Sequence, residues 1–275
     1  MVHNILVYNL LKLKGWGPKK VYTYVKQNFF NYENCLNNLG SVLSQEEKET
    51  FKNNLAATKH LFLSLNEKGI KTISIFDDEF PERLANSTDC CVFLFYKGNI
   101  DLLKKPSVSI IGTRKPSQQS LKNGALVSEY FAKQGYVINS GLAIGCDTIA
   151  HQTCLNVGGE TVAILPSSID DIQPRQNKSL AEEIVNNNGL LISEVAPGTP
   201  YDKNSYARRD RIQSLLTSVI IVIECDVNSG TMIAVTKHLK DGKHVFGLDG
   251  FQNHFIKNRI NIENSDDLKK IEKLI

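Results

Sequence analysis

The chain lacks the segments that mark membrane-spanning, secreted and disulfide-stabilised proteins. It holds no apolar run long enough to cross a bilayer, and its first residues show neither the cationic start nor the small-residue cleavage site of a secretory signal. Its 6 cysteines form no C-x-x-C pair and lie mostly in apolar segments, which predicts that they are reduced and buried. These absences favour a cytoplasmic protein that does not contact membranes.

Signatures of common catalytic and cofactor sites are also missing. The dinucleotide fingerprint G-x-G-x-x-G does not follow the first strand of the main domain, and G-x-x-x-x-G-K-[ST] is absent, which argues against nicotinamide and ATP chemistry. The sequence has no G-x-S-x-G elbow and no pair of catalytic carboxylates. We therefore predict no catalytic residues and no cofactor, and expect a binding protein rather than an enzyme.

A metal site has to be considered at His151, which lies four residues after Asp147 and three before Cys154. These residues span only about two turns of one helix, and no second cluster of ligands occurs elsewhere in the sequence, which argues against zinc. We expect instead that His151 is a helix residue hydrogen-bonded to Asp147, and we predict no metal.

The length of the chain allows one sizeable core and a smaller appended domain. Its 275 residues are 41% hydrophobic and 22% charged, as in ordinary globular proteins, so disorder is not expected. The formal net charge of +3 is too small to establish nucleic-acid binding, because such a site depends on where basic residues gather.

Helical periodicity characterises residues 1–68, which we predict to form a small all-helical domain. Residues 15–20 interrupt the first apolar face before Val21 and Tyr24 resume it, as in a helix, a tight turn and a second helix. A Gly-x-Gly turn of this kind can hold a nucleic-acid phosphate, as in helix-hairpin-helix modules. On this motif alone we favour the simpler interpretation that the turn only requires glycine.

Short apolar runs alternate with helix-length segments from about residue 70. The runs are too continuously hydrophobic to have a solvated face, which is typical of buried parallel strands. They cover residues 108–111, 136–138, 161–165, 190–192, 219–223 and 244–247. The helices expected between them cover residues 118–134, 147–157, 178–187, 208–216 and 230–241. The pattern predicts an α/β fold with a mostly parallel, doubly wound sheet over residues 69–255, extended by strands from residues 73–99, and a tail at 256–275 with a short helix.

Three loops at predicted strand ends carry glycine, hydroxyl and cationic residues. Backbone N–H groups at helix N-termini, hydroxyls and cations are the groups that bind phosphate. The carboxyl ends of parallel strands meet at one edge of a sheet, so we predict several phosphate contacts along that edge. The candidate residues are Gly112, Thr113, Arg114, Lys115, Ser140, Gly141, Gly145, Ser229, Gly230 and Thr231.

A fourth element places Arg208, Arg209 and Arg211 at the start of a predicted helix. Cations are unfavourable at a helix N-terminus, so we expect a bound anion to hold them. The alternative is a solvated basic helix end neutralised by Asp210 and Glu194. Because four elements converge on one edge, we favour the first interpretation.

Taken together, these motifs resemble the DNA-processing protein A (DprA/Smf) family, of which the chain would be a diverged member. The resemblance covers roughly residues 69–250 and runs in order through FDDEFPERLANSTDCCVFLFYKGNIDLL, SVSIIGTRKPS, INSGLAIGCDTIAH, GGETVAILPSSIDDIQPRQNKSL, LLISEVAPGTP, RRDRI and NSGTMIAVTKHLKDGKHVFGLDG. It implies an extended Rossmann-like domain without dinucleotide that binds single-stranded DNA at the carboxyl edge. It further implies a homodimer that protects incoming DNA and loads a RecA-type recombinase onto it during natural transformation.

The resemblance also assigns DNA-contact residues by motif. Arg114 matches the arginine of G-[ST]-R and is the leading phosphate contact that the resemblance implies. Arg175, Asn177 and Lys178 lie where the family places basic DNA contacts. The remaining matches are Ser140, Gly141 and Gly145 in S-G-L-A-x-G, Arg209 and Arg211 in F-P-x-R-N-R-I, and Ser229, Gly230 and Thr231 in the S-G-S turn.

Four positions depart from the family pattern. Ser167 stands in a stretch that is glycine-rich in the family, Gln173 replaces a tyrosine, and Tyr206 replaces the phenylalanine of F-P. Asp210 replaces the asparagine of R-N-R. A carboxylate among phosphate-binding groups is expected to weaken DNA affinity unless it pairs with an arginine.

Two other functions remain open. Related Rossmann-like nucleotide phosphoribohydrolases bind a phosphate at this edge, but they depend on the glutamate of P-G-G-x-G-T-x-x-E, and residues 227–234 contain no carboxylate. A nucleotide-sensing module that binds a small ligand and signals to a partner is the other possibility. The sequence does not separate it from DNA binding, because a nucleotide and one unit of a DNA strand offer similar groups.

Overall fold

The computed structural model describes residues 2–28, 30–87, 89–226, 228–248, 256–261 and 265–275. Internal contacts divide the chain into two units, Met1–Lys97 and Gly98–Ile275. The boundary therefore lies at the last residue of the second strand, whereas the change of sequence periodicity placed it after residue 68.

Helices make up most of the first unit: α1 (Val2–Leu11), α2 (Pro18–Gln27), α3 (Tyr32–Val42) and α4 (Gln45–Glu67). Pro18 takes the first position of α2, where its missing N–H is harmless. Helix α4 begins with a capping box, in which the side chains of Ser44 and Glu47 each accept a hydrogen bond from the other's backbone N–H. The turn predicted between the first two helices is found.

An antiparallel strand pair completes the first unit: β1 (Lys71–Ser74) and β2 (Phe93–Gly98), with α5 (Glu82–Ala85) between them. Phe93 contacts the ring of Tyr8 on α1 with centroids 5.3 Å apart, and that of Phe62 on α4 with centroids 6.0 Å apart. These strands share an aromatic core with α1 and α4, which is the physical reason that they belong with the helices.

A parallel sheet forms the centre of the second unit. Its strands are β3 (Ser107–Ile111), β4 (Val137–Ser140), β5 (Thr161–Ile164), β6 (Leu190–Ser193), β7 (Val219–Val222), β8 (His244–Leu248) and β9 (Asn258–Ile260). They lie in the order β6-β5-β4-β3-β7-β8-β9, and every neighbouring pair is parallel. The strand order reverses direction at β3, so the crevice between β3 and β7 is the place where such sheets bind ligands.

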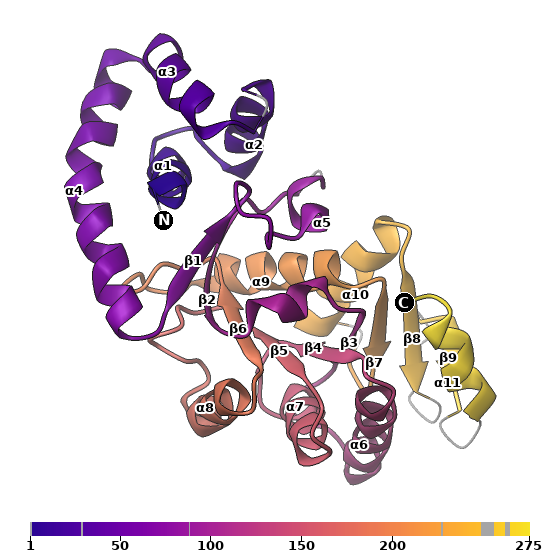
Figure 1. Ribbon diagram of the computed structural model, residues 1–275. Coiled ribbons are helices and arrows are strands. Elements are labelled where there is room, and N and C mark those ends of the chain that lie inside the picture. Colours follow the sequence, from indigo (N-terminus) through magenta and orange to yellow (C-terminus); the bar gives the residue numbers. More distant parts are fainter. Residues whose placement is uncertain (1, 29, 88, 227, 249–255, 262–264) are drawn as a thin grey trace. The chain divides into compact units, whose positions relative to one another are not determined.

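Helices cover both faces of this sheet. The helical segments of the second unit are η1 (Ile100–Lys104), α6 (Gln118–Lys133), α7 (Cys146–Asn156), η2 (Arg175–Asn177), α8 (Lys178–Asn186), α9 (Lys203–Leu216), α10 (Gly230–Lys240) and α11 (Ser265–Glu272). Figure 1 shows α6, α7 and α8 on one face and α9 and α10 on the other. The predicted Rossmann-like, doubly wound α/β fold is therefore confirmed.

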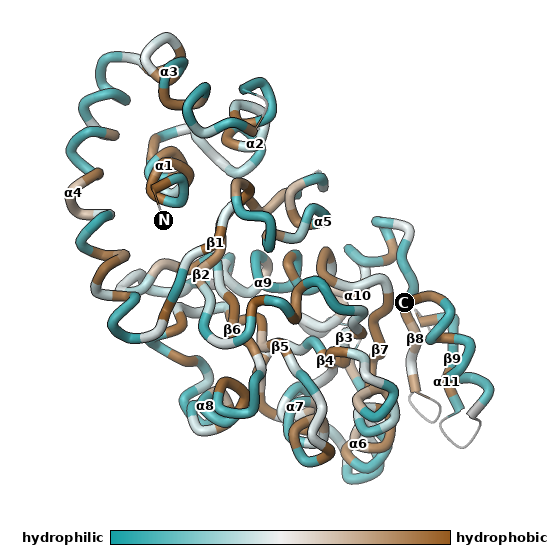
Figure 2. Tube along the Cα trace, viewed as in Figure 1, coloured by the Kyte–Doolittle hydropathy of each residue, from teal (hydrophilic) through white to brown (hydrophobic). Residues whose placement is uncertain are grey.

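Continuous burial explains why the central strands were recognisable in the sequence. Every residue of β3, β4, β5, β6 and β7 is buried, and β7 is hydrophobic along its length (Figure 2). The C-terminal tail packs on the same core through Leu268 and Ile271 of α11, and β9 adds a strand beside β8. All six cysteines are buried, as predicted.

Helix α9 starts five residues earlier than predicted, at Lys203 rather than at Arg208. Asp202 caps it, because its carboxylate accepts a hydrogen bond from the backbone N–H of Ser205 at 2.9 Å. Among the described residues, no helix combines the length and the apolar character needed to cross a membrane.

Candidate nucleic-acid interface

A cavity of about 480 Å³ lies at the carboxyl ends of β3 and β7, where the strand order reverses. Segments that are far apart in the sequence meet there: the loops after β3 and β4, the middle of α9 and the first turn of α10. The lining residues are Ile111, Gly112, Thr113, Arg114, Lys115, Ala143, Asp147, Tyr206, Arg209, Asp210, Gln213, Ser229, Gly230, Thr231 and Ala234. Most of the predicted phosphate-binding residues are thus brought to one place.

The loop after β3 is fixed by backbone contacts and leaves its cations exposed. Thr113 donates its N–H to the carbonyl oxygen of Glu224 at 2.6 Å. A Cβ at Gly112 would lie 2.5 Å from Sγ of Cys146, so only glycine fits between the strand end and α7. Arg114 is exposed, and its guanidinium carbon lies 5.3 Å from the ring centre of Tyr206. This loop therefore presents exposed cations on a backbone that is held by contacts with neighbouring elements.

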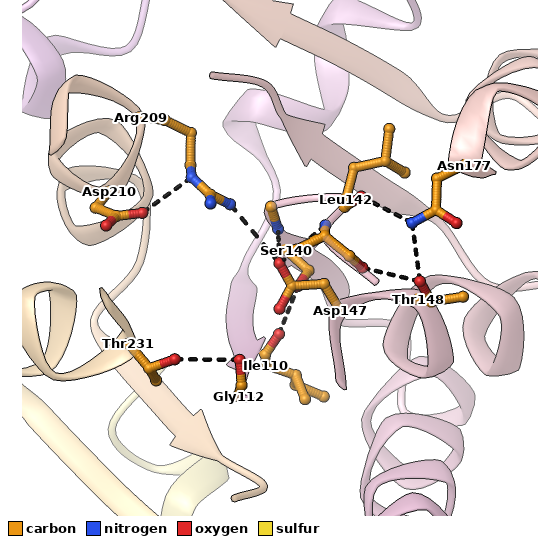
Figure 3. A network of polar contacts seen from close by, with 12 residues as sticks. Ile110, Gly112, Ser140, Leu142, Asp147, Thr148, Asn177, Arg209, Asp210 and Thr231 are labelled. Atoms are coloured by element: carbon orange, nitrogen blue, oxygen red, sulfur yellow. Dashed lines mark hydrogen bonds and ion pairs between the residues drawn. The ribbon is translucent and has the colours of Figure 1, made fainter. Parts of the chain in front are cut away.

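The loop after β4 is built around the carboxylate of Asp147. Its Oδ2 accepts hydrogen bonds from the backbone N–H groups of Gly141 and Ala143, both at 3.2 Å. Ser140 is fully buried and donates its hydroxyl to the carbonyl oxygen of Ile110 at 2.7 Å (Figure 3). Both N–H groups therefore already have an internal anion, and Ser140 shapes the loop from within the core.

Two glycines of this loop are required by close approach. A Cβ at Gly141 would lie 1.1 Å from Nη1 of Arg209. Gly145 has a φ of +85°, and a Cβ there would lie 2.6 Å from the carbonyl oxygen of Thr113. These predicted residues thus pack the two loops together and make room for the guanidinium.

Arg209 lies between two carboxylates in the wall of the cavity (Figure 3). Its Nε is 2.9 Å from Oδ1 of Asp210, and its Nη1 is 3.7 Å from Oδ2 of Asp147. Burial raises the pKa of both carboxyl groups, whereas the charge of Arg209 acts in the opposite direction. Asp210 thus pairs with an arginine. We expected a carboxylate at this position to weaken DNA affinity unless it made such a pair.

The other two arginines of α9 have acidic partners as well. Arg211 is 8% exposed and pairs with Glu194, while Nη2 of Arg208 lies 3.5 Å from Oδ1 of Asp202. Because α9 begins at Lys203, these arginines lie beyond its first turn, so their predicted position at the helix start was wrong. The alternative partner Glu194 is the one observed for Arg211.

The segment around the start of α8 contains one buried residue that supports the β4 loop and two exposed basic residues. Asn177 is 6% exposed and donates to the carbonyl oxygen of Leu142 at 2.8 Å and to Oγ1 of Thr148 at 2.9 Å, so it holds the β4 loop in place. Arg175 and Lys178 are exposed. A second cavity of about 80 Å³ adjoins this segment and is lined by Arg114, Gly141, Ala143, Ile144, Pro166, Gln173, Pro174, Gln176, Tyr206 and Arg209. It shares Arg114, Ala143, Tyr206 and Arg209 with the larger cavity.

Helix α10 opens toward the larger cavity. Thr231 donates its hydroxyl to the carbonyl oxygen of Gly112 at 3.1 Å, which ties the helix to the β3 loop. Ser229 takes the cap position, yet its side chain makes no capping hydrogen bond and donates instead to the carbonyl oxygen of Asp226. The first N–H groups of α10 therefore lack a side-chain cap beside Arg114, and this end of the helix carries a partial positive charge.

His151 contributes structure to this region. It is fully buried, and its Nδ1 lies 2.7 Å from the hydroxyl of Thr161, so the expected bond to Asp147 was wrong. Burial and the charge of Arg209 lower the pKa of His151 to about 3. Within the part of the chain that the structure describes, no group of histidine, cysteine and acidic side chains is arranged to hold a metal ion.

Sequence reasoning missed two lining residues. Gln213 is a single polar residue in the middle of α9, which gives no motif, and Tyr206 was noted only as a departure from a pattern. The fold is that of a Rossmann-like protein, and an uncapped helix start beside exposed cations and a cavity at the switch point are features with which such proteins bind phosphate-bearing ligands.

The chain belongs to the DNA recombination-mediator protein A family, whose model matches residues 71–263. It is 37% identical over 188 residues to the DNA processing protein DprA of Streptococcus pneumoniae, and the match covers 68% of this chain and 66% of that relative. The X-ray structure of DprA from Streptococcus pneumoniae has a TM-score of 0.74 at 28% identity, covering 98% of this chain and 92% of that one. DNA processing protein A from Helicobacter pylori, whose structure concerns its single-stranded DNA binding mode, has a TM-score of 0.66 at 28% identity, covering 75% and 97%. The resemblance drawn from the sequence motifs is confirmed.

Proposed function

We propose that this chain binds single-stranded DNA along the carboxyl edge of its sheet. The observation that carries the proposal is the uncapped start of α10 beside the exposed cations Arg114 and Lys115, at the point where the strand order reverses. Both features attract phosphate without reading sequence. The single-stranded DNA binding mode of the Helicobacter pylori relative supports the same ligand here.

A single strand suits the two adjoining cavities better than a duplex does. The cavities share Arg114 and Tyr206, so consecutive nucleotides of one strand can pass from one to the other over the tyrosine ring. Unpaired bases can turn into such spaces and stack on aromatic side chains, whereas paired bases stay inside the helix.

The biological role that we propose is that of a recombination mediator in natural transformation. In this role the chain, as a homodimer, protects incoming single-stranded DNA and loads a RecA-type recombinase onto it. Membership of the recombination-mediator family supports this role. Light scattering of the purified protein tests the dimer. Recombinase filament formation on DNA coated with a single-strand binding protein tests the loading.

A nucleotide-sensing module is the second candidate, and the cavity itself favours it. A volume of about 480 Å³ is within the range of small-molecule sites, which is roughly 300–1,000 Å³. Hydrolysis of the nucleotide is not expected, because residues 228–234 present no carboxylate and Asp210 is paired with Arg209. Chromatography of nucleoside monophosphates incubated with the protein checks this point.

Gel-shift titrations with single-stranded DNA, duplex DNA and competing mononucleotide test the proposed function. We expect the protein to bind the single strand, and we expect that neither excess duplex nor millimolar mononucleotide displaces it. Equal affinity for duplex would contradict the proposal. Complete displacement by equimolar mononucleotide would favour the sensor.

A further inference from the structure

We infer that the larger cavity selects guanine among the bases of a bound single strand. The inference rests on the proposed function and adds a specificity to it, carried by Asp210 and Gln213 of α9. No base-reading motif is visible in the sequence, and the specificity arises because the fold turns one face of α9 toward the cavity.

Asp210 and Gln213 lie three residues apart on one face of α9, and both line the cavity. Oδ1 of Asp210 lies 2.9 Å from Nε of Arg209, and the carboxylate lines the cavity. Gln213 is 2% exposed, and within the described chain its amide nitrogen has no hydrogen-bond partner. A buried amide nitrogen normally has a partner, so Gln213 offers an open donor to a ligand, and the carboxylate of Asp210 offers the lone pairs that its contact with Arg209 leaves free.

The remaining walls place a nucleotide in one orientation. The start of α10, at Ser229 and Gly230, attracts the phosphate group. Tyr206 offers its ring for stacking, with Tyr201 against it at 6.2 Å between ring centres and Arg114 above it. Tyr206, Asp210 and Gln213 lie at positions i, i+4 and i+7 of α9 and share one face of the helix, so a base stacked on Tyr206 can reach Asp210 and Gln213 with its hydrogen-bonding edge.

Guanine is the base whose edge matches these side chains. A carboxylate only accepts hydrogen bonds, and guanine alone offers it two adjacent donors, N1–H and the N2 amino group. Its O6 accepts from an amide N–H such as that of Gln213. Adenine and cytosine bring a ring nitrogen lone pair toward the carboxylate, and thymine flanks its single N3–H with two carbonyl oxygens. Asp210 therefore favours guanine, and it repels the lone pairs that adenine, cytosine and thymine direct toward it.

The experiment measures fluorescence anisotropy of labelled oligothymidylates that are identical except for one central nucleotide. We expect a central deoxyguanosine to tighten binding about tenfold over thymidine or deoxyadenosine, the gain typical of one good bidentate base contact. Deoxyinosine keeps N1–H and O6 but lacks the N2 amino group, and should lose most of that gain. Asp210→Asn should abolish the guanine preference, and Gln213→Leu should reduce it.

Asp101→Asn removes a carboxylate from an exposed position outside both cavities and should keep the preference. Thermal melting establishes that each variant is folded. Equal affinity of the wild-type protein for all the oligonucleotides would overturn the inference and leave DNA binding in place. A guanine preference that survives in Asp210→Asn would overturn it as well. Absence of binding to every oligonucleotide would instead contradict the proposed function.

Discussion

The guanidinium of Arg209 occupies the space that a side chain at position 141 would need. A Cβ at Gly141 would lie 1.1 Å from Nη1 of Arg209, and it would also lie 2.9 Å from Oδ2 of Asp147. The β4 loop, α7 and α9 therefore meet at one glycine, and a change there affects packing and charge pairing together.

Gly141→Ala should lower the free energy of unfolding by about 2 kcal/mol or more, because Arg209 must leave its place between two buried carboxylates. Urea denaturation measures the change. Gly40→Ala is the matched control, since a Cβ at Gly40, within α3, meets nothing within 4 Å. It should leave stability unchanged or raise it slightly. Equal effects of the two substitutions would show that the close approach at Gly141 is unimportant.

Salt should weaken binding of single-stranded DNA steeply. If the strand places about four phosphates against the edge, log affinity should fall with log salt with a slope of roughly −3. Anisotropy titrations across a range of sodium chloride concentrations give the slope. Affinity that does not change with salt would rule out phosphate contacts as the main source of binding.

Arg114→Ala should weaken binding of oligothymidylate about tenfold and make the salt slope shallower by about one, because one phosphate contact is lost. Stability should change little, since Arg114 is exposed at a strand end. Lys270→Ala in α11 is the control, because it removes one exposed cation whose partner is Asp267. If both variants bind equally weakly, the site is not at the β3 loop.

Asp210→Asn should tighten binding of oligothymidylate several-fold at low salt. The substitution removes a negative charge from the cavity and leaves Arg209 with Asp147 alone. The gain should shrink as salt screens the charge. Affinities of the variant and the wild-type protein at low and high salt provide the comparison. Weaker binding by the variant would mean that Asp210 mainly orients Arg209.

Stability should fall with decreasing pH through the buried histidine His151. Its folded-state pKa of about 3 lies below the value of about 6.5 in the unfolded chain, so between these pH values the unfolded state binds the extra proton. The loss is about 1.4 kcal/mol per pH unit below pH 6.5. His151→Gln should show a shallower decline in urea denaturation between pH 7 and about pH 5. Parallel curves for the two proteins would contradict this. Asp147 and Asp210 are present in both, so they do not affect the comparison.

Much of the second unit was predictable because its strands are buried on both faces. Continuous apolar runs such as that of β7 lack the polar positions of an amphipathic surface helix, so they are not mistaken for one. Strand β9 could not be recognised, because Asn258 and Arg259 are two of its three residues and only pairing with β8 makes it a strand. The unit boundary was also hidden, since it depends on ring contacts of Phe93 with residues of α1 and α4.

The location of the candidate site was predictable from the sequence, but the contacts that its residues make were not. Glycines and hydroxyls marked the loops, but the sequence could not show that Ser140 and Asn177 bond to the protein's own backbone. The pairing of Arg211 with Glu194 joins residues on different elements, which only the tertiary structure brings together. Gln213 gave no signal, because its importance comes from what surrounds it.

The carboxylate of Asp147 also bears on the rate at which the proposed site would bind a single strand. By accepting from the N–H groups of Gly141 and Ala143, it holds the β4 loop in one shape before any ligand arrives. The conformational entropy of that loop is then lost when the chain folds and not when DNA binds. A strand that reaches this edge would find the loop already in its bound shape. The association rate should then depend on diffusion and electrostatic steering more than on rearrangement of the protein.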